Sequence, residues 1–428
     1  MNMEKSLKKE TIYLYLIQFS NFLVPLAAFP YLTNKLGIEG FGKFGYAQTL
    51  FFLFMFLIDF GFILSGAKSI SLNKENKLQV DKIYSNIQFV KFLIYTCIIL
   101  ILFISTYFNL FGLNFLDIDT HLLWFAIVAS FSAILIPTYL FNGLSLNSTL
   151  AFITIFIKLV FLIPVFVFVK DVGDLYLAVV FQLMSGLIVG VIVQYLIFKR
   201  NYARFSFKLI NKQISINETR QSYDNFIGSF FTLGFTYLTP LVIKFTLGDV
   251  SLGVYTVVDK LVNVLRQLYV PLNQAFFAKI CIAYDSKDKL NYYSMIRKVS
   301  LFYLILGGVA FFGNLLLGEW LLPFIFGFNY DLSNFLSVAI ATQIIISIAS
   351  IIVNFFIIPS DLAYILKRIY FVGLLFYFPI CLQFVNLFKL YGVFFSMLLI
   401  EVFILLIMLV FIYIKRFKFS FIDSSKLG

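Results

Sequence analysis

Eight charged side chains stand within or beside long apolar segments, and they are the residues best placed to do chemistry. A charge at the centre of a membrane span costs about 2.5–3.5 kcal/mol on insertion scales, so it normally faces a partner or a water-filled cavity. Cations there can bind phosphate, whereas acids can pair with cations or exchange protons. The cations are Lys91, Lys158, Lys244, Lys260 and Arg266, and the acids are Asp59, Asp259 and Glu401.

Lys158 and Arg266 are the strongest candidates for binding an anion. Lys158 lies near the middle of the apolar segment 148–169, where its ammonium cannot easily reach water. Arg266 lies deep in the segment 252–272, and a guanidinium there can clamp a phosphate with two hydrogen bonds. The alternatives are a purely structural ion pair for Lys158, and contact with the lipid headgroups for Arg266.

The remaining cations have less certain surroundings. Lys260 and Asp259 are adjacent, so on a helix they point about 100° apart and cannot pair with each other. One of the two is expected to face a cavity. Lys91 either lines the same cavity or lies at the membrane interface, and Lys244 is expected to snorkel from the end of its span.

The two other acids could pair or couple transport to an ion. Glu401 is central in the apolar segment 391–414, so it either pairs with a cation from another span or takes part in proton coupling. Asp59 precedes Gly61 and either anchors a helix end or has a functional role.

The sequence contains few residues suited to metal binding or nucleophilic catalysis. His121 is the only histidine, and Cys97, Cys281 and Cys381 lie in apolar stretches without metal-ligand spacing. The glycines form no Walker loop, so ATP coupling is not expected. We expect no cofactor or metal, and energy from an H⁺ or Na⁺ gradient, the membrane potential or the substrate's own gradient.

The composition is that of a membrane protein. Of 428 residues 61% are apolar and 13% charged, whereas soluble domains carry about 45–50% apolar and about 25% charged residues. The excess of apolar side chains must face lipid. The net charge of +12 comes from short basic clusters between apolar segments, which predicts contact with membrane lipids and not with nucleic acid.

A span needs about 20 mostly apolar residues. That length predicts an all-α polytopic protein with about twelve spans, at 12–33, 44–66, 84–106, 121–142, 148–169, 175–198, 224–246, 252–272, 299–318, 334–357, 366–387 and 391–414.

The basic residues predict the orientation. With the N-terminus inside, the cytoplasmic segments hold 24 Lys and Arg residues and the outer segments hold four. The outer loops carry acids instead, among them Glu39, Asp117, Asp249 and Asp331. This bias predicts that both termini face the cytoplasm. The first apolar segment is span-length and lacks a cleavage site, so it is expected to be retained.

The chain also contains a weak repeat. The pattern Leu36-Gly37-x4-Gly42-x-Phe44 recurs as Leu247-Gly248-x4-Gly253-x-Tyr255, shifted by 211 residues. The predicted organisation is a six-helix lobe at 1–198, a basic cytoplasmic loop at 199–223 and a second six-helix lobe at 224–428. Such parallel repeats occur in transporters that bind substrate between lobes, near the bilayer midplane.

Several segments, in this order, resemble a known family. They are LGIEGFGKFGY at 36–46, DFGF at 59–62, GAKS at 66–69, YLFNG at 139–143, PLNQAFFAK at 271–279 and FGFNY at 326–330. The chain is similar to the Wzx-type polysaccharide repeat-unit flippases of the multidrug, oligosaccharidyl-lipid and polysaccharide exporter superfamily. It departs from the family pattern at Tyr139, Asn142 and Ala278.

The resemblance implies two six-helix lobes around a cationic cavity that opens alternately to each side. The implied substrate is an undecaprenyl-pyrophosphate-linked oligosaccharide for O-antigen or another surface polysaccharide. The resemblance also implies a polysaccharide polymerase and a chain-length regulator as possible partners. The excess of cations over acids in the spans agrees with an anionic substrate.

Three alternatives remain. A drug or metabolite exporter of the same superfamily would share the fold, and transport of a labelled lipid-linked sugar would separate the two. A membrane polymerase or ligase would need a long outer loop with catalytic groups, whereas the longest ones, near 107–120 and 319–333, are short. A scaffold would not need charges at mid-span.

Overall fold

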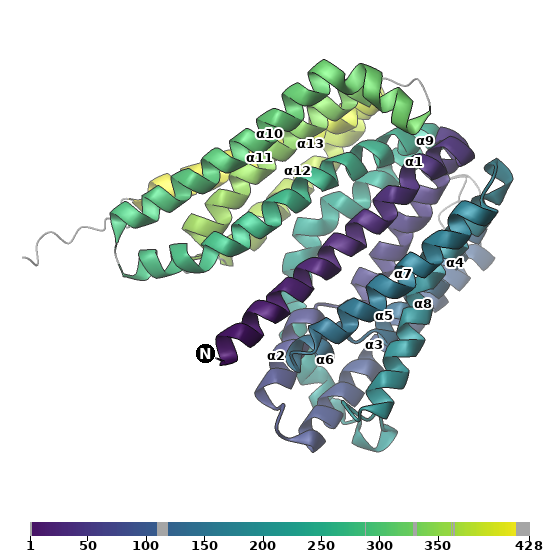
Figure 1. The fold of residues 1–428 in the computed structure, drawn as a ribbon, viewed down its shortest axis with the longest axis vertical. Helices are drawn as coiled ribbons and strands as arrows, with labels where there is room; N and C mark the ends of the chain where they lie inside the picture. Colours follow the sequence, from purple (N-terminus) through teal and green to yellow (C-terminus); the bar gives the residue numbers. More distant parts are fainter. Residues whose placement is uncertain are drawn as a thin grey trace, which may run out of the picture. The chain divides into compact units, whose positions relative to one another are not determined.

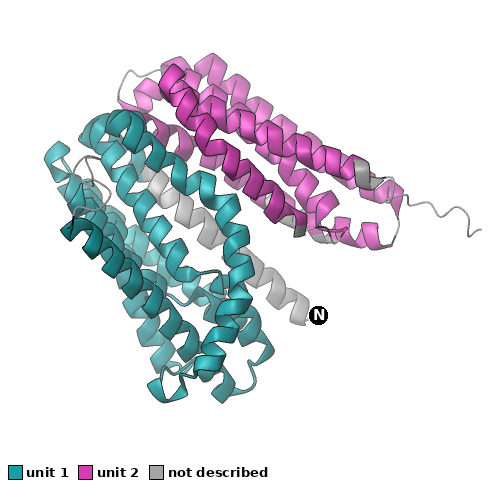
Figure 2. Ribbon diagram, turned by 180° about the vertical axis from the view of Figure 1, so that it is seen from behind, with its two compact units in different colours: residues 1–253 teal, residues 254–428 magenta. Residues whose placement is uncertain are grey.

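The computed structural model describes residues 2–108, 119–286, 288–327, 332–360, 362 and 364–416, with side chains described from Ala28 onward except at a few positions. The described residues are helical almost throughout (Figure 1). Ten of the described helical stretches are long and apolar enough to cross a membrane. The chain divides into two compact units, residues 1–253 and 254–428 (Figure 2).

The described residues of the first unit form eight complete helices and the start of a ninth. They are α1 (Asn2–Asp59), α2 (Phe62–Leu72), α3 (Lys77–Tyr107), α4 (Thr120–Ser130), α5 (Ser132–Leu135), α6 (Thr138–Gly143), α7 (Asn147–Phe168), α8 (Leu175–Lys199) and α9 (Lys212–Asp285). Helix α1 packs on α4, α7 and α8, and α2 packs on α6. Short helical turns lie at η2 (Val172–Asp174) and η3 (Phe207–Leu209).

Two helices are too long for one crossing and bend at equivalent glycines. At 1.5 Å per residue, the 58 residues of α1 would extend about 87 Å, and the 74 of α9 about 111 Å, against about 30 Å of hydrocarbon. Both bend at a residue with positive φ, Gly37 (φ 66°) in α1 and Gly248 (φ 80°) in α9. Glycine is required there because only it adopts this conformation without a Cβ clash.

Within the described residues, counting each bent helix as two crossings gives twelve, and the predicted all-helical membrane fold is confirmed. The two bends occupy the same position in the repeat, 211 residues apart. The span predicted at 121–142 is a series of three short helices, α4 to α6, interrupted near Phe131 and Pro137. Proline supplies no N–H, so it breaks the helix there.

The second unit contains the end of α9, α10 (Lys289–Phe326), α11 (Leu332–Ile352), the π-helical turn η4 (Val353–Ile357), α12 (Tyr364–Phe388) and α13 (Leu390–Arg416). Helices α10 and α13 both pack on α11, and α12 packs on α13. Gly327 ends α10 in the left-handed conformation, as C-terminal glycines commonly do.

Part of the predicted basic loop is helical. Helix α9 begins at Lys212, because the Asn211 side chain accepts hydrogen bonds from the backbone N–H groups of Gln213 and Ile214 and caps the helix. The connection between α8 and α9 is therefore shorter than 199–223. The lobe boundaries at 198 and 224 stay a prediction. Asp117, Asp331, the last three residues of the segment 326–330 and the basic tail after residue 416 lie outside the described residues.

Candidate functional site

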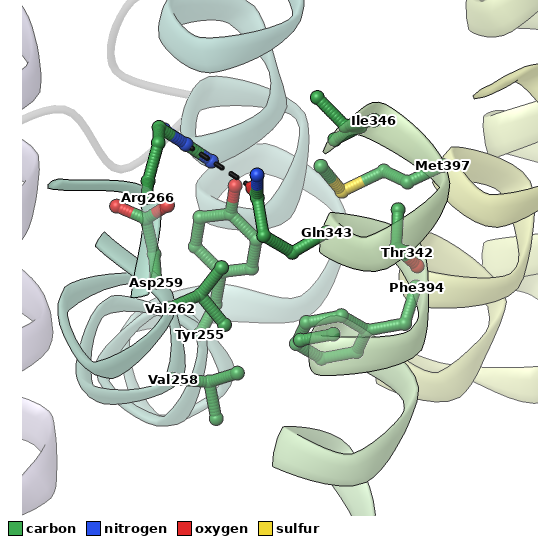
Figure 3. A pocket seen from close by; sticks show the side chains of 11 residues that line it. Tyr255, Val258, Asp259, Val262, Arg266, Thr342, Gln343, Ile346, Phe394 and Met397 are labelled. Atoms are coloured by element: carbon green, nitrogen blue, oxygen red, sulfur yellow. Dashed lines mark hydrogen bonds between the residues drawn. The ribbon is translucent and has the colours of Figure 1, made fainter. Parts of the chain in front are cut away.

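A small pocket in the second unit contains the best candidate site. Its walls come from one face each of α9, α11 and α13 (Figure 3). The polar lining consists of Tyr255, Asp259, Arg266, Thr342 and Gln343, and the rest is apolar, including Phe394 and Met397. The cavity volume is about 30 Å³, enough for one or two water molecules. A larger ligand would have to move side chains or enlarge the space.

Arg266 is held by a row of polar side chains. Its NH1 group donates to Asn263 Oδ1 at 2.8 Å and its Nε donates to Gln343 Oε1 at 3.2 Å. Asn263 Nδ2 in turn donates to Asp259 Oδ2 at 3.0 Å, and Gln343 Nε2 donates to Ser347 Oγ at 3.3 Å. Residues 259, 263 and 266 share one face of α9 because they are four and three residues apart.

The two hydrogen-bond acceptors of Arg266 are neutral amides, and the acids near it are Asp259 and Glu401. Neutral acceptors orient a guanidinium without cancelling its charge, and the NH2 group remains to bind an anion. The Arg266 side chain turns toward Gln343 of α11 (Figure 3).

Glu401 lies on the same face of α13 as Phe394 and Met397, one turn beyond Met397. It is close enough to Arg266 for an electrostatic interaction. The structure thus brings together three of the predicted site residues, Asp259, Arg266 and Glu401. Lys260 follows Asp259 in α9, but it does not lie on the helix face that residues 259, 263 and 266 share.

Lys91 and Asp59 form a buried ion pair in the first unit. The Lys91 Nζ lies 2.6 Å from Asp59 Oδ1, and its side chain is only 1% exposed. The ammonium also lies 5.2 Å from the centroid of the Tyr139 ring, a cation–π distance. Asp59 Oδ2 accepts a hydrogen bond from the backbone N–H of Ile63 in α2. This geometry favours a structural role for both residues, and their predicted part in binding or coupling stays a prediction.

The interruption between α4 and α6 is stabilised by side chains from α3 and α8. Lys91 donates to the carbonyl of Ala133, Gln88 to that of Ile134 and Gln194 to that of Leu135. These carbonyls lack normal helical partners because the chain breaks before Pro137. Polar side chains from neighbouring helices satisfy such groups inside a membrane.

The two other cations differ in their surroundings. Lys158 is half-buried on α7, which packs on α1 and α8, and no other predicted site residue lies on that helix. Lys244 was expected to snorkel, and that prediction is wrong: its Nζ lies 2.7 Å from Asp249 Oδ1, and both side chains are buried. The bend at Gly248 turns Asp249 back toward Lys244, which the sequence alone does not show.

Sequence reasoning missed the neutral polar residues of the site. Tyr255, Thr342 and Gln343 line the pocket, and Asn263 accepts a hydrogen bond from Arg266. One signal could have found Asn263, since it follows Asp259 by four residues and precedes Arg266 by three. Gln343 is an uncharged polar residue in the middle of an apolar span, and a search confined to charges passes over it.

Comparison with known protein families shows which family this chain belongs to. Residues 7–277 match the family described as "Polysaccharide biosynthesis protein". The chain belongs to this family. The resemblance drawn from the six sequence segments is thereby confirmed.

Two relatives are similar over most of their length. One, from Shigella dysenteriae, is 28% identical and is covered over 99% of its length by 94% of this chain. Another, from Escherichia coli strain K12, is 29% identical, with 77% of this chain covering 78% of it. Both are named "Putative O-antigen transporter".

Solved structures show the same fold. An inward-facing MATE-family multidrug resistance transporter has a TM-score of 0.71 at 11% identity, over 92% of this chain and 96% of its own. Its outward-facing form has a TM-score of 0.61 at 12% identity, over 97% and 96%. This member of the polysaccharide biosynthesis family thus shares its fold with these membrane transporters.

Proposed function

We propose that this protein translocates a lipid-linked oligosaccharide from the cytoplasmic to the outer face of a bacterial inner membrane, by alternating access, for O-antigen or another surface polysaccharide. Both termini then lie in the cytoplasm. The substrate is a glycan on a polyprenyl pyrophosphate, of which undecaprenyl pyrophosphate is the expected form. The names of the Shigella and Escherichia relatives support this assignment.

One observation carries the substrate class: Arg266 is half-buried beside the pocket of the second unit, and its guanidinium donates hydrogen bonds to two neutral amides. A diphosphate cannot cross hydrocarbon alone, because each unsatisfied polar group there costs several kcal/mol. A fixed guanidinium replaces the water around a phosphate oxygen, while the polyprenyl chain remains in lipid. Lys158 is the proposed second cation, and Lys260 and Lys91 are further candidates; Lys91 forms an ion pair with Asp59.

Asp259 and Glu401 are the proposed ion-coupling groups. Asp259 is joined to Arg266 through Asn263, and Glu401 interacts with Arg266 electrostatically. Uptake of H⁺ or Na⁺ by either acid would free the positive charge of Arg266 for the diphosphate, and release would weaken that attraction. A polymerase and a chain-length regulator are the proposed downstream partners.

The test is complementation of a strain that lacks its own flippase. Arg266→Ala is expected to abolish surface polysaccharide while the amount of protein in the membrane stays unchanged. Lys158→Ala is expected to do the same. The matched control is Arg297→Ala, which removes an exposed arginine from α10 and is expected to leave export intact.

The outcomes separate two functions. Normal surface polysaccharide with both Arg266→Ala and Lys158→Ala would show that neither cation is part of the substrate site. Failure of the wild-type protein to complement, together with resistance to a cationic drug, would favour the drug-exporter alternative.

A further inference from the structure

The connection between α8 and α9 is basic and carries exposed aromatic rings. Its cations are Lys199, Arg200, Arg204, Lys208 and Lys212, and residues 199–217 contain no acid. Phe207 is 77% exposed, Phe205 is also exposed, and the two rings meet edge to face at 5.1 Å. Large exposed aromatic rings are costly in water, so they indicate a surface that meets another apolar phase.

The backbone of this connection is clamped to α3. Arg204 donates its N–H to Asp81 Oδ1 at 2.8 Å and accepts from Ser85 Oγ at 3.2 Å. The Ser206 N–H donates to Ser85 Oγ at 3.1 Å. These contacts fix the segment that carries the two phenylalanines.

Asn86 provides the second half of the clamp. This fully buried side chain donates to the carbonyl of Leu209 at 3.0 Å and accepts from the Asn211 N–H at 2.9 Å and from Ser215 Oγ at 2.7 Å. The start of α9 is therefore tied to the same helix. A connection held at both ends is a preformed surface, not a loop that needs ordering before it binds.

The clamped segment has two distinct sides. Tyr202 packs its ring against Phe141, and Ala203 is buried in the core of the first unit. The side chains of Arg204, Phe205, Phe207 and Lys208 are exposed. The guanidinium of Arg204 uses Nε to bond Asn201 Oδ1 at 2.9 Å, which leaves its two NH₂ groups for another acceptor.

We propose that this surface, formed by Arg204, Phe205, Phe207 and Lys208, binds the headgroups of anionic phospholipids, with the two rings inserted beside the acyl chains. The charge of the segment is complementary to such lipids, and apolar rings beside cations occur in segments that lie in the membrane interface. The exposed Phe198, at the end of the membrane-spanning helix α8, places the segment next to the hydrocarbon boundary. This lipid contact is separate from the transported substrate.

A single tryptophan at position 207 tests the proposal in the full-length protein. Phe207→Trp is combined with Trp124→Phe and Trp320→Phe, and the protein is placed in nanodiscs with a small fraction of brominated lipid. Brominated phosphatidylglycerol is expected to quench this tryptophan roughly twofold more than the same fraction of brominated phosphatidylcholine, because anionic lipid is enriched at the basic surface. High salt is expected to reduce the difference.

Matched variants decide the outcome. Arg204→Gln with Lys208→Gln is expected to make the two brominated lipids equal quenchers, whereas Arg297→Gln with Lys298→Gln, an exposed basic pair on α10, leaves the difference unchanged. Thermal unfolding of each variant shows that it is folded. Equal quenching by both lipids in the otherwise unmodified reporter would overturn the proposal. So would a tryptophan shielded from both lipids and exposed only on removal of a bound protein.

Discussion

Gly42 and Gly253 each lie against a backbone carbonyl at the equivalent position of the other repeat. A Cβ on Gly42 would lie 1.9 Å from the Asp249 carbonyl oxygen, and a Cβ on Gly253 would lie 2.1 Å from that of Ile38. Both pairs, 42 with 253 and 38 with 249, are 211 residues apart. The two copies of the repeat therefore contact each other in a mutually symmetric way, which confirms that the weak sequence pattern is structural.

Replacing either glycine by alanine is expected to lower stability by about 1–3 kcal/mol, because the new methyl group meets backbone that cannot rotate away. Thermal unfolding in detergent measures the effect. Gly308→Ala is the control, since a Cβ there meets open space. A Gly42→Ala protein as stable as the control would contradict the close contact.

The ion pair between Lys91 and Asp59 predicts unequal single and double variants. Lys91→Met alone is expected to cost about 3–5 kcal/mol, because it leaves Asp59 without its cation in a largely buried site. Asp59→Asn with Lys91→Met together should cost less than Lys91→Met alone, since no charge remains unpaired. Thermal unfolding tests this, and transport by the double variant shows whether the pair has any role besides structure. A double variant that is less stable than both single variants would contradict the expected energetic coupling between Lys91 and Asp59.

The neutral cradle around Arg266 can be tested at Gln343. Gln343→Glu is expected to reduce polysaccharide export more than Gln343→Ala, because a carboxylate 3–4 Å from the guanidinium neutralises it, whereas alanine only loosens it. Arg266→Lys is expected to be poorly active, since lysine keeps the charge without the planar fork. The measurement is surface polysaccharide at matched protein levels. Full export by Gln343→Glu would show that a free positive charge is not needed there.

Asn86→Ala is expected to release the connection between α8 and α9. The N–H of Asn211 and the carbonyl of Leu209 would lose their partner, at about 1 kcal/mol for each hydrogen bond. Limited trypsin digestion should cut faster after Arg204 and Lys208. Asn217→Ala, at an exposed position nearby, is the control and should not change the rate. Unchanged cutting of Asn86→Ala would argue against the clamp.

The sequence predicts the fold well and the partners of the charges poorly, for a physical reason. Apolar segments of span length are a local signal, so the approximate number and positions of the crossings could be predicted. The helices that continue through the bends at Gly37 and Gly248 were not predicted. The pairing of Lys91 with Asp59 and of Lys244 with Asp249 depends on helix packing and on a backbone bend. Asn263 and Gln343 carry no charge, and only the folded chain shows that they orient Arg266.

The most direct test is transport of a polyprenyl-pyrophosphate oligosaccharide by the purified protein in liposomes, with the glycan labelled on one face. The wild-type protein and Arg297→Ala are expected to move the label to the other face, and Arg266→Ala to leave it where it started. Equal movement with Arg266→Ala, or none with the wild-type protein under either an H⁺ or a Na⁺ gradient, would contradict the account.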